Sequence, residues 1–223
     1  DAGRDTFHRH PWSLGGGGAS ELRQQLEGGR ATISKVAHSI GFGAISGEDN
    51  VFLQPSAALR RQRIRHLLPL LSGEALRDWS TMVELHMIWP NDQRAIVLPE
   101  REIPEVLAYF WRYRTSLRCR KAFGVPVEQR GLRWWEVREV YAERLQTPLT
   151  ITFAFVATHN HFVLDRGGKV FNRSAPVIKL PATATEDDHL ALLGLLNSST
   201  GAFWMRQVFH SKGAQGVNEG GKE

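Results

Sequence analysis

The richest apolar stretch of this chain is only eight residues long, from Leu149 to Val156. A helix that spans a membrane needs roughly 18 or more consecutive apolar residues. A run of about four to eight residues is instead typical of a buried strand. The chain, with 42% hydrophobic residues, must therefore build an ordinary globular core from short elements.

Helix and strand patterns alternate along the rest of the chain. Helices are predicted within 21–27, at the start of 59–71, over 103–121, and twice after Thr185, where a capping box opens the first helix and the second ends near His210. Strands are predicted as a hairpin over 40–53, two strands within 79–98, and single strands over 150–158, 161–164 and 170–180. This order predicts an α+β fold with mixed β-sheets and packed helices.

Some of these elements carry more specific expectations. The turn over Arg166–Lys169 predicts a hairpin between its flanking strands, and Pro176 predicts an edge strand or a bulge. Pro104 suits the first turn of its helix. The apolar stripe of that helix comprises Ile103, Val106, Leu107, Phe110 and Leu117.

Basic residues are abundant and are mostly arginine. The formal net charge is +5, and 22 of the 28 basic residues are Arg. Arginine suits bidentate recognition of phosphate and guanine, although a GC-rich genome also favours Arg codons. Aromatic and basic residues interleave in Tyr109–Lys121 and Gln129–Arg138. The group of Arg114, Arg118, Arg120 and Lys121 is therefore a candidate for nucleic-acid contact, with core packing of the aromatic residues as the alternative.

Several catalytic motifs are absent from the sequence. Amino-methyltransferases that act on adenine need a Pro-Pro-aromatic loop, and the ten prolines include no Pro-Pro dipeptide. Gly41–Phe42–Gly43 matches a cofactor-binding turn only in part, because β-forming residues follow where a helix should begin. Neither Glu-x-Lys nor Asp-x-Lys, typical of restriction nucleases, occurs. We therefore expect no catalytic residue and no bound cofactor in this chain.

His159 and His161 offer one alternative chemistry. On a strand they would share a face and could bind a metal, with Asp165 or His189 as third ligand. Hydrogen bonding at a polar strand end explains the same residues, and we expect no metal. Cys119 is the single cysteine, which excludes an intrachain disulfide and a cysteine-based zinc site.

The beginning of the chain has no apolar region of the kind found in signal peptides. The single cysteine fits a reducing cytoplasm, where we expect the protein. The first residue is Asp rather than Met, and we expect the chain to be part of a longer protein.

The last third of the chain carries a family resemblance. Residues 147–149, 153–181 and 187–213, with the element Leu195–Leu196–Asn197–Ser198, resemble the C-terminal region of PglX-like adenine-specific methyltransferases from phage-defence systems (BREX and phage growth limitation). They also resemble, more loosely, the recognition domain of type IIG restriction–modification enzymes. Residues 43–53, 73–79 and 111–115 look similar too, so the resemblance covers about 41–213.

The resemblance implies a TaqI-like target-recognition domain over 41–210, preceded by a leading segment with a short helix over 1–40 and followed by a disordered tail over 211–223. An upstream methyltransferase domain would bind S-adenosylmethionine and flip an adenine, while this chain would bind double-stranded DNA. Other phage-defence proteins are further candidate partners, and no membrane is expected. The expected DNA contacts are Arg112, Arg114, Arg118, Lys121, Arg130 and Arg133, with Asn172 and Arg173 as second choices.

Two other functions stay open at this point. The chain could be a protein-interaction module of a phage-defence complex. It could also be a metal-dependent nuclease or hydrolase that uses His159 and His161.

Overall fold

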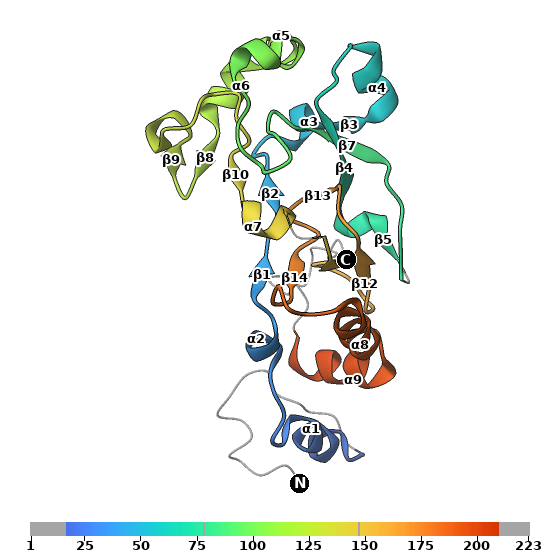
Figure 1. The fold of residues 1–223 in the computed structure, drawn as a ribbon. Coiled ribbons are helices and arrows are strands. Elements are labelled where there is room, and N and C mark those ends of the chain that lie inside the picture. Colours follow the sequence, from blue (N-terminus) through green and yellow to red (C-terminus); the bar gives the residue numbers. More distant parts are fainter. Residues whose placement is uncertain (1–16, 78, 147, 210–223) are drawn as a thin grey trace.

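The structure is a computed structural model that describes residues 17–77, 79–146 and 148–209. The α+β fold with mixed sheets and packed helices is confirmed. Figure 1 shows an elongated body in which the strands occupy the middle and helices lie at both ends. The tail predicted over 211–223 lies outside the described residues, as do residues 1–16 of the leading segment.

The first four-stranded sheet is antiparallel throughout. Its strands, in spatial order, are β1 (Ser39–Gly41), β14 (Val177–Lys179), β11 (Thr150–Phe153) and β12 (Phe162–Asp165). Strand β11 contains the predicted buried strand, since its first three residues are buried. It ends at Phe153 instead of Thr158, because residues 154–161 form the loop that leads into β12.

The second four-stranded sheet is mixed. In spatial order it contains β13 (Val170–Phe171), β4 (Leu67–Leu71), β7 (Leu85–Ile88) and β3 (Leu53–Pro55), with a parallel pair between β13 and β4. The predicted hairpin of β12 with residues 170–180 is therefore wrong. Gly167 and Gly168 do turn with positive φ, but the chain then crosses into this other sheet.

Proline 176 immediately precedes β14, which is a central strand of the first sheet. The prediction of an edge strand or bulge there is wrong. A proline just before the first residue of a strand removes no ladder hydrogen bond, and the Pro176 carbonyl accepts bonds from Phe153 N (3.1 Å) and Thr152 Oγ1 (3.0 Å).

The described residues also form three two-stranded ribbons. They are β2 (Ala44–Ile45) with β10 (Glu139–Val140), β5 (Leu76–Arg77) with β6 (Ser80–Thr81), and β8 (Lys121–Ala122) with β9 (Val125–Pro126). The hairpin predicted over 40–53 is wrong, because β1 and β2 pair with strands from distant parts of the chain. Of the two strands predicted within 79–98, β7 forms, whereas the second is reduced to a bridge between Asn91 and Val97.

The remaining elements are helices, most of them short. The α-helices are α1 (Ala19–Glu27), α2 (Ile33–Val36), α3 (Asp49–Phe52), α4 (Ser56–Arg61), α5 (Pro104–Trp111), α6 (Arg114–Cys119), α7 (Ala142–Leu145), α8 (Glu186–Leu196) and α9 (Ser199–Val208). The 3-10 turns are η2 (Gly73–Ala75), η3 (Glu100–Glu102) and η4 (Glu128–Arg130). No helix among these described residues is long and apolar enough to cross a membrane.

Two helix predictions need correction. The helix and turn predicted over 59–71 are α4 followed by strand β4. The single helix predicted over 103–121 is two helices, because the chain turns at Arg112 and Tyr113, where Tyr113 N bonds the Phe110 carbonyl (2.8 Å). Pro104 at the start of α5 is confirmed, and so is the apolar stripe, which is buried except for the half-buried Leu107.

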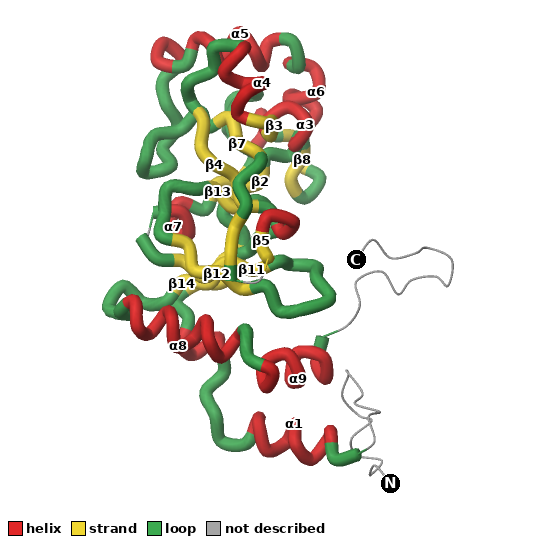
Figure 2. Tube along the Cα trace, turned by 90° about the vertical axis from the view of Figure 1, so that its right-hand side faces the viewer, coloured by secondary structure: helices red, strands yellow, loops and turns green. Residues whose placement is uncertain are grey.

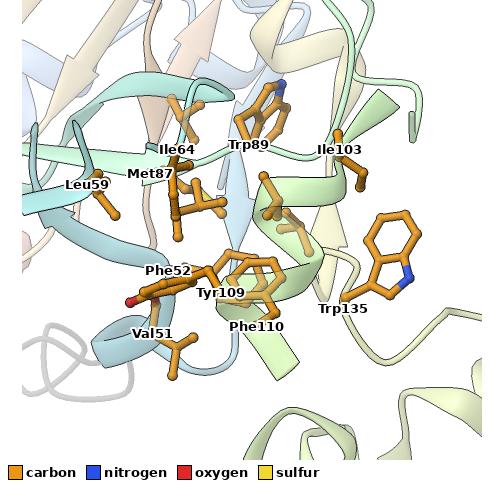
Figure 3. Packing of buried hydrophobic residues seen from close by; sticks show 14 of the residues in the cluster. Val51, Phe52, Leu59, Ile64, Met87, Trp89, Ile103, Tyr109, Phe110 and Trp135 are labelled. Carbon is orange, nitrogen blue, oxygen red and sulfur yellow. The ribbon is translucent and has the colours of Figure 1, made fainter. Parts of the chain in front are cut away.

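The largest core cluster lies under α5, where that stripe meets the second sheet (Figure 3). Phe52 from α3 packs on Phe110 with ring centroids 4.6 Å apart, and Trp135 is buried beside them. This cluster fixes α5, and through it the position of α6 and of the β8–β9 ribbon.

The last two helices form as predicted. The Thr185 hydroxyl accepts a bond from Asp188 N, and the Asp188 side chain accepts one from Thr185 N, which is the predicted capping box. Ser198 caps α9. Figure 2 shows α8 lying below strands β11, β12 and β14, against which its leucines pack.

Candidate nucleic-acid interface

Basic side chains, exposed except for the half-buried Arg114, gather around α6 and the β8–β9 ribbon. Arg114 and Arg118 lie on α6, Lys121 begins β8, and Arg130 ends η4, the turn that follows β9. An ion pair between Arg118 and Glu128 (2.9 Å) ties α6 to η4. Four of the predicted contact residues thus lie on elements next to one another in the chain, and Figure 1 shows α6 and the β8–β9 ribbon close together.

Arg120 lies among these residues in sequence but is buried. Its guanidinium donates to the carbonyls of Leu117 (2.9 Å), Ser46 (2.6 Å), Trp134 (2.7 Å) and Glu136 (2.9 Å). Burial lowers the pKa of Arg120 to about 10, so the side chain stays charged at neutral pH. The prediction that Arg120 contacts nucleic acid is wrong, because this side chain joins α6 to two other segments.

Aromatic rings support three of the predicted contact arginines. The guanidinium carbon of Arg112 lies 4.8 Å from the centre of the Tyr109 ring. That of Arg114 lies 4.4 Å from the Trp111 ring, and that of Arg133 lies 5.4 Å from the Trp135 ring. Arg112 also bonds Gln62, and Arg133 lies 3.9 Å from Glu136. A stacked guanidinium keeps N–H donors along its edge, so stacking orients these side chains without using all their donors.

The loop between β13 and β14 carries Asn172 and Arg173. The Asn172 carboxamide oxygen accepts bonds from Ser174 N (3.0 Å) and Ser174 Oγ (2.8 Å), so this side chain builds the turn. Arg173 is exposed beside it. The turn rests on Gly73, whose N–H donates to Ser174 Oγ (2.9 Å), and a Cβ at Gly73 would lie 2.6 Å from the Ser174 carbonyl oxygen.

A cavity of about 310 Å³ connects this loop to the first group. Its lining includes Asn172, Arg173 and Arg138, with Glu48 and Asp49 on the β2–α3 side. Arg138 donates to the Lys121 carbonyl (2.8 Å), and Ser116 on α6 donates to Glu48 (2.8 Å). Arg138 thus links the Lys121 main chain to the cavity beside Arg173. We group the basic residues of these elements under the name basic face: Arg112, Arg114, Arg118, Lys121, Arg130, Arg138 and Arg173.

Arg133 lies apart from this cavity. It lines a second cavity of about 350 Å³ together with Val97, Pro99, Gly131 and Glu136.

Sequence reasoning missed two residues of this region. Arg138 was not distinguished from its neighbours, since nothing local reveals its bond to Lys121. Phe123, at the tip of the β8–β9 ribbon, is 94% exposed. The Phe-Gly dipeptide between two short β-forming segments is the signal that could have identified it.

The two histidines considered for a metal lie in the loop before β12, not on a strand, so the expected shared face is lost. His159 Nδ1 bonds the neighbouring Thr158 hydroxyl (2.9 Å). Of the proposed third ligands, Asp165 pairs with Lys169, and His189 Nδ1 bonds the Thr185 carbonyl (2.7 Å). Within the described ranges no three His, Cys, Asp or Glu side chains are arranged to hold a metal.

No protein-family model matches the chain. Over 219 residues, 96% of its length, the chain is 38% identical to the adenine-specific methyltransferase PglX of Streptomyces coelicolor, of which it spans 18%. The type IIL restriction–modification enzyme MmeI, solved in complex with DNA, shares the fold: 15% identity, a TM-score of 0.59, and coverage of 82% of this chain and 23% of that one. The resemblance to PglX-like methyltransferases is confirmed.

Proposed function

We propose that this chain, a relative of one part of PglX, is the sequence-specific DNA-recognition module of a larger N6-adenine DNA methyltransferase in phage defence or restriction–modification. The chain spans about a fifth of that relative's length, so methyl transfer and S-adenosylmethionine belong to the parent protein. Residues 41–210 are the recognition domain in this proposal, and an upstream methyltransferase domain is its partner. The shared fold with an enzyme solved on DNA supports it.

The basic face is the observation that carries the proposal. It combines exposed cations from α6, β8, η4 and the β13–β14 loop. The buried Arg120 ties the end of α6 to the main chain at Ser46 and Trp134. Lysine and arginine neutralise phosphates and supply most of the affinity for duplex DNA. Phosphate contacts also fix the register in which other side chains read base edges.

Within the basic face the residues differ in how they can act. Arg114 is oriented by Trp111 and can present its donor edge to a phosphate or to guanine. Arg118 must exchange Glu128 for a phosphate. Arg173 lies beside the cavity that also holds Glu48 and Asp49, whose carboxylates repel phosphate and would instead accept from cytosine N4.

A selection experiment tests sequence-specific recognition. The purified chain is used to enrich duplexes from a random pool, and the bases methylated by the full-length parent protein are mapped separately by sequencing. We expect the enriched sequence to contain the methylated site. Enrichment of an unrelated sequence, or of none, would contradict recognition by this module.

A second function, a surface for protein partners, is favoured by one specific observation. The β5–β6 ribbon exposes two large apolar side chains, Trp79 (56%) and Met82 (66%). Neighbouring exposed apolar side chains can form part of an apolar patch that binds another protein. We take the upstream methyltransferase domain as the partner in this second proposal, and Trp79→Ala should then weaken association of the two domains without changing DNA affinity.

A further inference from the structure

We propose that the β8–β9 ribbon inserts the ring of Phe123 into a DNA groove as an apolar wedge against the bases. This inference rests on the proposed DNA-recognition function and assigns a residue and a mode of contact to it. Phenylalanine is among the residues most often buried. At 94% exposed, Phe123 leaves nearly its whole ring in water.

The backbone at Phe123 is unfavourable for this residue type as well. Phe123 has φ 52° and Gly124 has φ 82°, and the register pairs Lys121 with Pro126 and Ala122 with Val125. This is a two-residue turn with both central residues left-handed, for which Asn-Gly is the preferred sequence. A bulky side chain is strained in that conformation. Exposure and strain together indicate that the ring acts on something outside the chain.

The base of the ribbon holds the tip in a fixed position. Ala122 and Val127 are buried, and Val127 N donates to the carbonyl of the buried Arg120 (3.1 Å). At the start of β8, Arg138 donates to the Lys121 carbonyl (2.8 Å). A side chain presented from such a base loses little further freedom on binding, which is what an inserting residue requires.

The surroundings of the ring select a nucleic acid over an apolar protein pocket. Lys121 is exposed on the same ribbon, and Arg118 and Arg130 lie on the elements packed next to it. Cations placed around a protruding apolar side chain can bind the phosphates on either side while the ring contacts or unstacks bases. An apolar protein pocket for Phe123 would not require these cations on the neighbouring elements.

Two variants of the full chain separate DNA contact from folding. Phe123→Asn relieves the turn strain, so we expect a higher midpoint of thermal unfolding than in the unchanged chain. The same variant should bind a random-sequence duplex about tenfold more weakly, as should Phe123→Ala, because a contact between an aromatic ring and a base is lost. The slope of binding against salt should stay the same, because neither variant removes a charge.

Met82→Ala is the control, since it truncates another exposed apolar side chain (66% exposed), which directly follows the β5–β6 ribbon. We expect its DNA affinity to be unchanged. If the unchanged chain binds DNA and both Phe123 variants bind equally well, the wedge is overturned while the recognition function stands. Equal losses in Met82→Ala and Phe123→Ala would also overturn it. Absence of DNA binding by the unchanged chain itself would contradict the recognition function.

Discussion

The side-chain amide of Asn197 pairs with the main chain of a single residue, Phe162. Its nitrogen donates to the Phe162 carbonyl (2.8 Å), and its oxygen accepts from Phe162 N (3.1 Å). Phe162 begins β12, the edge strand of the first sheet, so the carboxamide completes the ladder as a neighbouring strand would. The Leu-Leu-Asn-Ser element is thus a structural joint between α8, α9 and the sheet.

We predict that Asn197→Ala lowers the free energy of unfolding by about 2 kcal/mol, since it leaves two main-chain groups of Phe162 without partners. Urea denaturation followed by circular dichroism measures this. Asn197→Asp keeps the acceptor but places a carboxylate oxygen against the Phe162 carbonyl. Because these two oxygens repel each other, we expect its loss of stability to be at least as large as that of Asn197→Ala. A loss below about 0.5 kcal/mol in Asn197→Ala would mean that water replaces the amide at little cost.

Arg120→Met should destabilise the chain by about 3 kcal/mol or more, because four carbonyls lose their donor at once. Arg120→Lys restores the charge but not the fork of donors, and should recover only part of the loss. Chemical denaturation of both variants checks this. Equal stability of Arg120→Lys and the unchanged chain would show that charge alone matters at this position.

Gly73→Ala and Gly194→Ala should change stability in opposite directions. A Cβ at Gly73 would overlap the Ser174 carbonyl, so we expect a loss of about 1–3 kcal/mol and a displaced Arg173 loop. A Cβ at Gly194, within α8, would meet no atom within 4 Å. Alanine there should stabilise the helix by about 0.5–1 kcal/mol. A stabilising Gly73→Ala would contradict the tight contact between the two loops.

Lys179 predicts a pH dependence of stability. Burial lowers the pKa of Lys179 from 10.5 to about 8 in the folded chain. Between about pH 8 and 10.5 the unfolded state therefore binds more protons than the folded state, so this residue makes stability rise with pH across that window. Below about pH 8 its unfavourable contribution is present in full.

Lys179→Met provides the comparison, because it removes this titration together with the bonds from Nζ to the Leu149 carbonyl (3.2 Å) and to Thr150. The free energy of unfolding of the unchanged chain, minus that of Lys179→Met, should increase as the pH is raised from about 8 to 10. A difference that stays constant over this range would show that the pKa of Lys179 is not lowered by folding.

Local signals predicted the elements that depend on neighbouring residues. The starts of α8 and α9 depend on capping side chains within one turn: Thr185, Asp188 and Ser198. The helical spacing of the apolar stripe from Ile103 to Leu117 predicts which of its residues are buried. Strand β13 shows the limit. Its sequence indicates a strand after a glycine turn, but its parallel partner, Leu70–Leu71, lies about a hundred residues earlier in the chain.

The candidate site divides in the same way. The sequence alone predicts which residue types form the site, since arginine and aromatic residues cluster in it. Burial of Arg120 and exposure of Arg118 could not be distinguished, because the end of α6 falls between them and turns one side chain inward. The link from Lys121 through Arg138 to Arg173 arises only from folding.

Salt-dependent binding tests the central claim most directly. Fluorescence anisotropy of the chain with a random-sequence duplex is measured from about 50 to 200 mM salt, with Arg118→Ala beside Arg166→Ala. Both arginines are exposed and paired with a glutamate, but Arg166 lies near α8, away from the basic face. We predict steep weakening with salt, a slope reduced by about 0.9 in Arg118→Ala, and no change in Arg166→Ala. Absence of binding at the lowest salt, or equal slopes in the two variants, would contradict DNA recognition by the basic face.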